Sequence, residues 1–294
     1  MKSGFVAILG RPNVGKSTFL NAILSKKVSI VSPKPQTTRD NIIGVLTEKD
    51  YQMVFIDTPG LFEGEAALDK FMNKEARSSL GDADICLFMI SADNFQEDDP
   101  DFKTLKALKL NCPFIILVNK IDLATAPKME ALLSKLHEEF PNKEIIQMSA
   151  LTNFGLKDVK DAVAKYLPEG PMYYEEGTIT DKGTAFDIKE TVRYEMLHFL
   201  SDEVPHQSAV TIDSLNEKSK EIYCEATIWV EKKSQIGIVV GKGGDMIKKI
   251  SMTARRDLEK RLHKHIDLRI EVKQAADWRQ KTDKLKAFGY SKED

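Results

Sequence analysis

The sequence has few cysteines and no long apolar run. Its three cysteines, Cys86, Cys112 and Cys224, lie far apart, so neither a disulfide framework nor the spacing of a metal site can be read from them. We therefore expect reduced thiols and a cytoplasmic protein. The longest apolar runs, residues 85–90 and 114–118, are much too short to cross a bilayer. The N-terminal residues lead straight into an apolar strand, so we expect no signal peptide.

The charge of the chain is unevenly distributed, although the net charge is only −2. From Glu231 to Asp294 the chain carries 17 Lys or Arg and 10 Asp or Glu residues, a net charge of +7, while the remainder carries −9. A basic end on an acidic body favours a polyanionic partner for that end. A solvated charged face is the commoner reason for such a pattern, so the charge alone leaves both interpretations open.

Length and composition predict two domains of ordinary size. The chain has 294 residues, of which 42% are hydrophobic and 30% charged, so each domain can form a core. In the first 165 residues, apolar strands alternate with amphipathic helices, which predicts a six-stranded, mostly parallel sheet covered on both faces. Strands 42–48 and 51–56 are joined by a two-residue turn, so one strand must run antiparallel. The predicted strands span residues 5–9, 42–48, 51–56, 85–91, 114–118 and 145–148, and the predicted helices 16–25, 68–80, 101–110, 128–140 and 156–166.

The order of elements changes after residue 167. Residues 168–184 contain several Pro and Gly residues and no sustained period, so we interpret them as a linker between a domain of residues 1–167 and a domain of residues 185–294. The second domain is predicted to be a compact α+β unit, with a glycine loop between an apolar, strand-like run and a helix. Its predicted elements are a helix at 186–201, strands at 208–215 and 221–231, a helix at 245–264, a strand at 266–273 and a closing helix at 276–287.

Residues 10–17 read Gly-Arg-Pro-Asn-Val-Gly-Lys-Ser, which is a complete phosphate-binding loop. An apolar strand precedes it and a helix follows it, and this context distinguishes the loop from a chance glycine-rich turn. Its backbone N–H groups and the helix N-terminus would surround phosphate oxygens. Lys16 would reach the β- and γ-phosphates, and Ser17 would hold Mg²⁺ through its hydroxyl group. The residues predicted to contact the phosphates are Gly10, Arg11, Pro12, Asn13, Val14, Gly15, Lys16, Ser17 and Thr18.

Two further motifs follow predicted strands and complete a nucleotide site. In Asp57-Thr-Pro-Gly60, Asp57 can hold the Mg²⁺ shell and the Gly60 N–H can meet a γ-phosphate. In Asn119-Lys-Ile-Asp122, the Asp122 carboxylate can accept hydrogen bonds from N1–H and the 2-amino group of guanine, a donor pair that adenine lacks. Lys120 would lie along the base. The residues predicted here are Asp57, Thr58, Pro59, Gly60, Leu61, Asn119, Lys120, Ile121 and Asp122.

A third motif, Ser149-Ala150, follows the last predicted strand of this domain. A backbone N–H of this pair would meet guanine O6, and Asn119 would brace the surrounding loops. Each motif is weak by itself. In order, at the carboxyl ends of successive strands, they predict a guanine nucleotide site, because ligands bind at that edge of open α/β sheets.

The second domain contains a G-x-x-G loop, made of Gly241, Lys242, Gly243 and Gly244, which opens a helix. In KH domains such a loop clamps the backbone of single-stranded RNA, because glycines let the sugar-phosphate chain approach closely. A helix-capping glycine turn is the alternative. The basic surface predicted to extend this RNA site consists of Lys248, Lys249, Arg255 and Arg256. Residues 278–290 are predicted to form a helix whose aromatic side chains pack on the core, and a basic helix on a membrane surface is the alternative.

Taken together, these motifs resemble the Era-type family of translation-factor-like GTPases, and the resemblance covers essentially the whole chain. It implies a P-loop GTPase domain followed by a type II KH domain, with Mg²⁺-dependent hydrolysis of GTP to GDP and phosphate. It also implies that residues 32–40 form a switch in which Thr38, with Thr37 as the alternative, completes the Mg²⁺ shell. The catalytic residues implied are Lys16, Thr38, Asp57 and Gly60.

The resemblance raises a question about how water is activated. Many related GTPases carry Gln where this chain has Leu61, and Leu61 cannot hydrogen-bond the attacking water. A catalytic group must then come from elsewhere, or intrinsic hydrolysis must be slow. Relatives with Asn at position 13 can bind K⁺ beside the phosphates, so the resemblance makes Asn13 a K⁺ ligand. A residue that only stabilises the loop is the alternative for Asn13.

The resemblance also implies biological partners. These are 16S ribosomal RNA near its 3′ end, the 30S subunit whose assembly the protein would assist, and a loose peripheral contact with the inner face of the cell membrane. We expect a monomer. Two other readings stay open: a membrane-associated cell-division regulator with incidental RNA binding, and an RNA chaperone whose nucleotide is structural.

Overall fold

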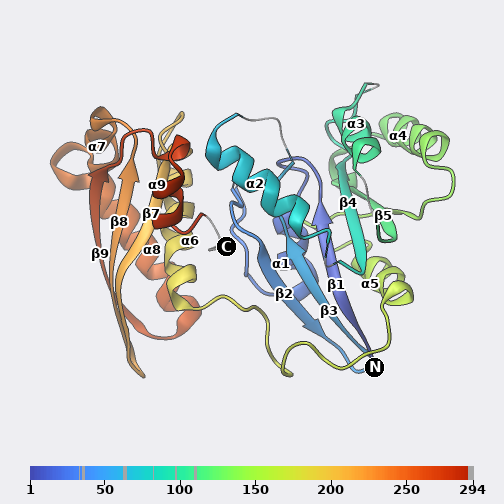
Figure 1. Cartoon of the computed structure of the whole chain (residues 1–294), viewed down its shortest axis with the longest axis horizontal. Helices are drawn as coiled ribbons and strands as arrows, with labels where there is room; N and C mark the ends of the chain where they lie inside the picture. The colour runs from blue at the N-terminus through green and yellow to red at the C-terminus, as the bar shows by residue number, and fades with distance from the viewer. Residues whose placement is uncertain are drawn as a thin grey trace. The chain divides into compact units, whose positions relative to one another are not determined.

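The structure is a computed structural model, and it describes residues 1–32, 34, 37–61, 65–81, 83–96, 98–108 and 111–290. Three residues of the predicted switch segment, Pro33, Pro35 and Gln36, and the last two residues of the predicted helix 101–110 therefore lie outside the described residues. The chain divides into two compact units, Met1–Glu63 with Met72–Asp181 and Gly64–Phe71 with Lys182–Asp294 (Figure 1). In the described part of the chain, no helix has both the length and the apolar composition needed to cross a membrane.

The first unit is built on a six-stranded sheet in the order β2-β3-β1-β4-β5-β6. Strands β2 and β3 pair antiparallel, and every other neighbouring pair is parallel. This confirms the predicted mostly parallel sheet with one antiparallel strand. The strands are β1 (Lys2–Leu9), β2 (Ile42–Thr47), β3 (Tyr51–Asp57), β4 (Ile85–Ser91), β5 (Phe114–Asn119) and β6 (Ile145–Gln147). The helices are α1 (Lys16–Leu24), α2 (Ala67–Ser78), α3 (Pro100–Ala107), the short η1 (Ile121–Leu123), α4 (Ala126–Glu139) and α5 (Leu156–Tyr166).

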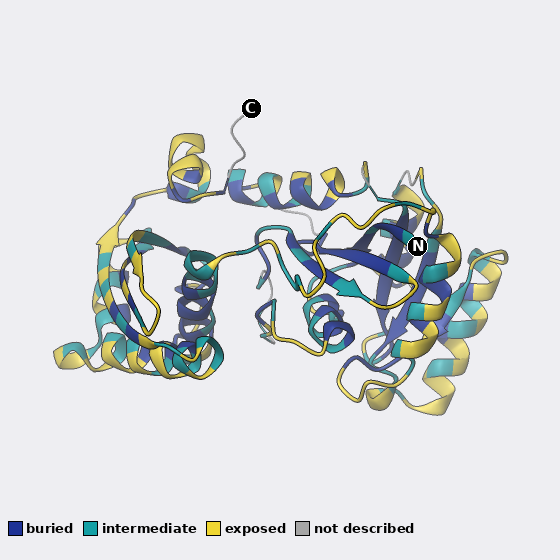
Figure 2. Ribbon diagram, turned by 90° about the horizontal axis from the view of Figure 1, so that it is seen from below, coloured by how far each residue is buried: buried dark blue, intermediate teal, exposed yellow. Residues whose placement is uncertain are grey.

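The sheet is covered on both faces, because the residues of its central strand β4 are buried on both sides. All seven residues of β4 are buried, as Figure 2 shows for the interior of this unit. Phe102 of α3 and Leu132 of α4 pack against one face, in a cluster with Cys86, Phe88 and Ile90, which alternate along β4. Burial of both faces leaves the ends of the strands as the places where the chain can meet a ligand.

The segment predicted as a linker, residues 168–184, lies for most of its length on the first unit. The Ser3 N–H donates to the Pro168 carbonyl oxygen at 3.0 Å, and the Val45 N–H donates to the Ile179 carbonyl oxygen at 2.8 Å. The segment therefore belongs to the first unit as far as Asp181. Backbone hydrogen bonds of this kind need no side-chain period, which is why the sequence alone predicted a linker here.

Gln52 of β3 fixes this segment. Its side chain is fully buried, and its Oε1 accepts from the N–H groups of Tyr173 and Tyr174 at 2.8 and 3.0 Å. Its Nε2 donates to the Tyr174 carbonyl oxygen and to Thr47 Oγ1, both at 2.9 Å. All the polar atoms of this side chain are thus satisfied inside the protein.

We predict that Gln52→Leu lowers the free energy of unfolding of the first unit by about 2–3 kcal/mol, because it leaves buried donors and acceptors without partners. Urea denaturation followed by a probe in this unit measures the loss. Gln147→Leu, which changes an exposed glutamine on β6, is the matched control and should lie within ~0.5 kcal/mol of the wild type. Equal losses in the two variants would contradict the role given to Gln52.

The second unit packs two long helices on a three-stranded sheet in the order β7-β8-β9, with β7 and β8 antiparallel and β8 and β9 parallel. Ile188 and Val192 of α6 and Ile250, Ala254 and Leu258 of α8 recur every four residues and form its core. This arrangement confirms the predicted type II KH fold. Its elements are α6 (Thr184–Phe199), β7 (Ser208–Glu217), β8 (Glu221–Val230), α7 (Lys233–Val240), η2 (Lys242–Gly244), α8 (Asp245–Leu262), β9 (His265–Gln274), η3 (Trp278–Gln280) and α9 (Thr282–Ala287).

Two predictions for this unit were wrong. The apolar run before the glycine loop is the end of α7, not a strand, and α7 starts with a cap in which Gln235 Oε1 accepts from the Lys232 N–H at 2.9 Å. The closing helix predicted at 276–287 is broken, because Asp277 adopts a left-handed backbone with φ of 54°. This turn directs Trp278 inward, so a 3-10 turn and the short α9 replace one helix.

Candidate functional site

A cavity of about 400 Å³ lies among the loops that follow the strands of the first unit. It brings together the phosphate-binding loop, Thr38, Gly60 and Lys120, which the sequence predicted as one site. Ile30, Val31 and Asn94 also line it, and no motif pointed to them. Asn94 lies three residues after the end of β4, so the rule that ligands bind at the carboxyl ends of strands could have predicted it. The full lining is Pro12, Asn13, Gly15, Lys16, Ser17, Thr18, Ile30, Val31, Ser32, Thr37, Thr38, Gly60, Asn94 and Lys120.

Lys16 places a positive charge inside the phosphate-binding loop. Its Nζ donates to the carbonyl oxygens of Gly10 and Arg11 at 3.0 and 2.9 Å, and the residue is only 6% exposed. Burial lowers the pKa of Lys16 to about 8, and the nearby Asp57 and Asp101 carboxylates oppose that shift. The ammonium is therefore largely charged at neutral pH and is held where phosphate oxygens would need it.

Three oxygen-bearing side chains meet beside this lysine. Ser17 Oγ lies 2.9 Å from Thr38 Oγ1 and donates to Asp57 Oδ2 at 2.7 Å. The other Asp57 oxygen, Oδ1, is buried and has no hydrogen-bond partner among the described residues. The Thr37 hydroxyl donates instead to the Lys34 carbonyl oxygen at 2.7 Å. Hydroxyl and carboxylate oxygens are the ligands that Mg²⁺ prefers, so this cluster fits Mg²⁺ and favours Thr38 over Thr37.

Ser29 is a member of this cluster that the sequence did not reveal. Its Oγ donates to Asp57 Oδ2 at 3.1 Å, and the residue is buried. Asn21 of α1 fixes the backbone there, because its Oδ1 accepts from the N–H groups of Val28 and Ser29 and its Nδ2 donates to the Ser29 carbonyl oxygen. Burial raises the pKa of Asp57 above its ordinary value, and Lys16 and the hydrogen bonds from Ser17 and Ser29 oppose part of that shift. The hydrogen bond from Ser29 thus favours the ionised form of Asp57.

The loop after β3 packs directly on the phosphate-binding loop. A Cβ atom at Gly60 would lie 2.7 Å from the Pro12 nitrogen, so only glycine allows this approach. The Leu61 N–H donates to the Gly10 carbonyl oxygen at 3.1 Å, and Thr58 Oγ1 donates to the Ile8 carbonyl oxygen at 2.7 Å. The Leu61 side chain is buried and apolar, and it offers no hydrogen bond to water.

On the base side, Asn119 braces the loops. Its Nδ2 donates to the Val14 carbonyl oxygen at 2.8 Å and its Oδ1 accepts from the Ala150 N–H at 2.9 Å. The Asp122 carboxylate is exposed and has no partner in the described part of the chain. The Ser149 N–H donates to the Phe154 carbonyl oxygen, so both N–H groups of the Ser149-Ala150 pair have partners within the protein. Their contact with guanine O6 stays a prediction.

The remaining predicted residues lie around the cavity in different ways. Asn13 is exposed and adopts a left-handed backbone with φ of 65°. Val14 is buried under the loop, and the Arg11 side chain lies 4.0 Å from Asp101 instead of lining the cavity. Ile121 starts the turn η1, and Pro59 is buried beside Gly60.

The glycine loop of the second unit joins α7 to α8. Gly241, Gly243 and Gly244 have φ values of 76°, 62° and 85°, and a Cβ at Gly241 would lie 2.6 Å from Met246 Cβ. Lys242 is exposed between them. The loop therefore presents bare backbone and one cation at the start of a helix, as a phosphate chain requires.

The four basic residues predicted on the following helix are all exposed on α8. Lys248 and Arg255 are seven residues apart, as are Lys249 and Arg256, so they form two rows on the side opposite Ile250. The Lys249 Nζ lies 4.3 Å from the centre of the Phe199 ring, which orients one of these charges. The basic rows continue from the loop along the helix.

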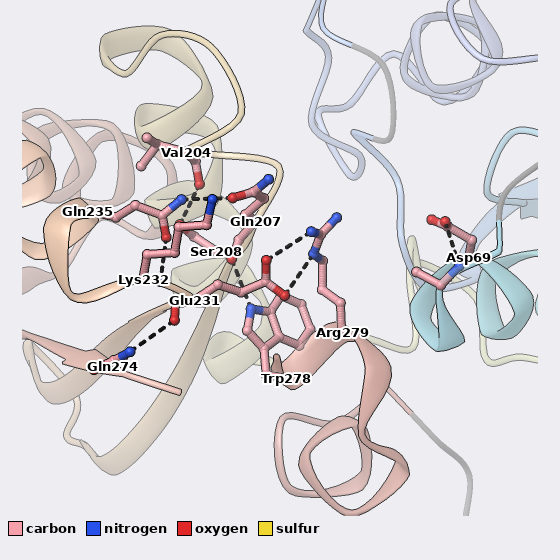
Figure 3. Close-up of polar contacts among 11 residues, drawn as sticks. Asp69, Val204, Gln207, Ser208, Glu231, Lys232, Gln235, Gln274, Trp278 and Arg279 are labelled. Carbon is pink, nitrogen blue, oxygen red and sulfur yellow. Dashed lines mark hydrogen bonds and ion pairs between the residues drawn. The ribbon is translucent and has the colours of Figure 1, made fainter. Parts of the chain in front are cut away.

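The chain after β9 is held against the residues just before β7 and α7 (Figure 3). Arg279 donates two hydrogen bonds to the Glu231 carboxylate, at 3.1 and 2.8 Å, and the Trp278 indole donates to the Gln207 carbonyl oxygen at 2.8 Å. Phe288 packs on Trp278 with ring centres 5.5 Å apart, and Tyr290 is buried. The prediction that these aromatic side chains pack on the core is confirmed.

This fold and these two sites define a P-loop GTPase joined to a KH domain. Comparison with known proteins agrees: residues 5–120 match the family model for the 50S ribosome-binding GTPase, and residues 203–279 match that for the KH domain. The chain is 46% identical to GTPase Era of Clostridium kluyveri over 99% of both chains, and 42% identical to GTPase Era of Lactobacillus helveticus over 100% of this chain and 97% of the relative. The chain belongs to the Era family of GTPases.

Solved structures agree along the full length. A crystal structure of Era in complex with MgGDPNP and nucleotides 1506–1542 of 16S ribosomal RNA is 36% identical, with a TM-score of 0.93 and coverage of 99% of both chains. A variant of Aquifex aeolicus Era bound to GDP·AlF4⁻ also has a TM-score of 0.93 at 36% identity, with 99% of this chain and 100% of that chain covered.

We predict that Ser29→Ala raises the Mg²⁺ concentration for half-maximal GTP turnover about fivefold, because Asp57 loses one hydrogen bond to its ionised carboxylate. Steady-state phosphate release across a Mg²⁺ titration measures the change. Ser29→Thr keeps the hydroxyl and should restore the wild-type requirement, whereas Ser134→Ala, an exposed position on α4, should have no effect. An unchanged Mg²⁺ requirement in Ser29→Ala would refute the role of Ser29.

Proposed function

We propose that this GTPase binds the 3′-terminal region of 16S ribosomal RNA through its KH glycine loop and assists assembly of the small ribosomal subunit. One observation carries the proposal: the Gly241–Gly244 loop, with Lys242 and Gly243 exposed, continues into two rows of cations on α8, in a chain similar over its full length to an Era crystallised with 16S RNA nucleotides. A glycine loop with this geometry suits the backbone of a single strand. Lys242 and the α8 N-terminus would meet phosphates.

In the nucleotide site, this chain's own residues would bind and orient GTP. Lys16 would contact the β- and γ-phosphates, and the Gly60 N–H would meet the γ-phosphate in the triphosphate state only. Ser17, Thr38 and Asp57 would hold Mg²⁺, and a relative crystallised with MgGDPNP supports this assignment. Mg²⁺, when bound, neutralises charge that develops on the phosphate oxygens. Asp122 would select guanine, with Lys120 along the base and Asn119 bracing both loops.

The same geometry supports a switch. Thr38 and Gly60 belong to the segments on either side of β2 and β3, and both would gain a contact only from the γ-phosphate. GTP would therefore order these segments and favour RNA binding, and RNA would favour the GTP state by the same coupling energy. Release of GDP and phosphate would reverse the change.

Leu61 cannot orient the attacking water, so hydrolysis depends on another group. We propose K⁺ held by Asn13 beside the phosphates, because Asn13 lines the cavity with an exposed side chain and no arginine lines it in the described part of the chain. A cation at that position would stabilise the charge that builds up between the β- and γ-phosphates.

We predict that GTP turnover is at least tenfold faster in KCl than in NaCl at equal ionic strength, since one well-placed charge contributes about 1.4 kcal/mol or more to the transition state. Phosphate release at saturating GTP measures the ratio. Asn13→Ala should remove the difference between the salts while leaving GDP affinity within about threefold. Equal rates in the two salts for the wild type would contradict the K⁺ assignment.

We predict that Lys242→Asp combined with Gly243→Asp abolishes RNA binding while GTP turnover without RNA stays within twofold of the wild type. The change replaces one cation and adds two anions where phosphates would lie, and Asp tolerates the left-handed backbone at Gly243. Binding is measured with a fluorescent RNA of the 16S 3′ end, and sucrose gradients report ribosomal subunits in cells that carry the variant.

Ser219→Asp combined with Lys220→Asp is the matched control, because it makes the same charge change on the exposed turn between β7 and β8. This control should bind RNA like the wild type. A wild-type gradient profile with the loop variant would refute the assembly role and favour the membrane-associated regulator. Retained RNA affinity would refute the loop as the RNA site.

A further inference from the structure

Asp93 meets the base-side lysine although no recognised motif contains it. Ser91, the last residue of β4, pairs with Asn119, the last residue of β5, and the Ala92 N–H donates to the Asn119 carbonyl oxygen at 2.9 Å. This parallel register brings the residues beyond the two strands side by side. The Lys120 Nζ accordingly lies 3.1 Å from Asp93 Oδ2.

Both partners of this ion pair are fixed by other contacts. Asp93 Oδ1 accepts from Ser91 Oγ at 2.5 Å, and the Asp93 carbonyl oxygen accepts from Lys128 Nζ at 2.6 Å. Burial raises the pKa of Asp93, but the hydrogen bonds from Ser91 and Lys120 outweigh it and lower the pKa below its ordinary value. Lys120 has a left-handed backbone with φ of 61°, which a residue with a side chain adopts only where its surroundings hold it.

The ion pair also borders the nucleotide cavity. Lys120 lines that cavity, and so does Asn94, the residue after Asp93. With its ammonium group held at Asp93, the aliphatic stem of Lys120 is the part left to face a base. Aliphatic stems of lysine cover flat apolar surface well once the charged end has a partner elsewhere.

We propose that Asp93 is a positioning residue for guanine nucleotides, which holds the Lys120 ammonium so that the lysine stem lies against the face of the base. The inference rests on the proposed position of guanine between Lys120 and Asp122. Asp93 acts on the face of the purine, whereas Asp122 acts on its edge. Its contribution should therefore be the same for GTP, GDP and inosine nucleotides, and it should change affinity without changing the chemical step.

The test is a double-mutant cycle in the full-length protein. Asp93→Asn keeps the shape of the side chain and removes its charge, and it should raise the Kd for GDP about fivefold, with kcat at saturating GTP within twofold of the wild type. Lys120→Met should have an effect at least as large. If Asp93 acts through Lys120, Asp93→Asn adds nothing in the Lys120→Met background.

Lys165→Met is the matched control, because it breaks an ion pair of similar length, 3.2 Å from Lys165 Nζ to Glu144 Oε1, between residues that do not line the nucleotide cavity, and it should leave the Kd for GDP unchanged. Ser91→Ala, which removes the hydrogen bond to the other carboxylate oxygen, should weaken GDP about twofold and gives a second variant should Asp93→Asn not fold. Additive effects of Asp93→Asn and Lys120→Met, or a wild-type Kd in Asp93→Asn and Ser91→Ala, would overturn the proposal.

The position of guanine has its own readout. Asp122→Asn should reduce the preference for GTP over ITP, because the edge contact is lost, while Asp93→Asn should leave that preference unchanged. An unchanged preference in Asp122→Asn would refute the position of guanine. A changed preference in Asp93→Asn would place this residue at the edge of the base and overturn its role on the face.

Discussion

The side chain of Asn119 connects the parts of the nucleotide site, and their mutual positions depend on it. Its amide nitrogen bonds the Val14 carbonyl oxygen in the phosphate-binding loop, and its oxygen bonds the Ala150 N–H, so one buried amide joins three loops far apart in sequence. A phosphate-binding loop by itself accepts many anions. Because Asn119 joins this loop to the loops around Asp122, the phosphate site and the base site lie at a fixed separation. A ligand must match that separation to occupy both sites. Selection of a guanine nucleotide thus depends on two hydrogen bonds of Asn119, a residue at the end of β5 to which we assign no contact with base or phosphate.

The site is assembled from polar groups that folding alone would not bury. Lys16 and Asp57 are both buried. Burial lowers the pKa of Lys16 and raises that of Asp57, so it favours the neutral form of each. Their mutual attraction and the hydroxyl groups of Ser17 and Ser29 offset much of this cost, but Asp57 Oδ1 keeps no hydrogen bond among the described residues. A buried oxygen without a hydrogen bond lowers the free energy of unfolding of the protein. The same group is ready to join a metal shell, so the stability lost in folding reappears as binding energy with little rearrangement.

Sequence reasoning succeeded where the chemistry is local and failed where it depends on tertiary register. Strands with continuous apolar runs, and loops that follow them, were placed within a few residues, because burial on both faces leaves a strong pattern. The apolar run at the end of residues 233–240 resembled a strand but is part of α7, because a short apolar run cannot distinguish a buried strand from a buried helix. The left-handed backbone of Asp277 ends the predicted closing helix, and hydrophobic periodicity gives no sign of such a break. Residues 168–181 attach to the first unit through backbone hydrogen bonds, which leave no side-chain pattern. Ser29 and Asp93 belong to no motif, because their roles come only from which strand ends and turns lie side by side.

The two phosphate-directed loops of this chain apply the same physics at different depths. In both, glycines expose backbone N–H groups at the start of a helix, α1 in one unit and α8 in the other, and one lysine adds charge. Lys16 is enclosed and its charge is desolvated, whereas Lys242 stands in solvent. Desolvated charges interact strongly and are barely screened by salt, which suits a small ligand held with fixed stoichiometry. Exposed charges bind a polymer weakly at each phosphate and release it readily. The enclosed loop therefore suits a ligand that must stay until it is hydrolysed, and the open loop suits an RNA strand that must be let go.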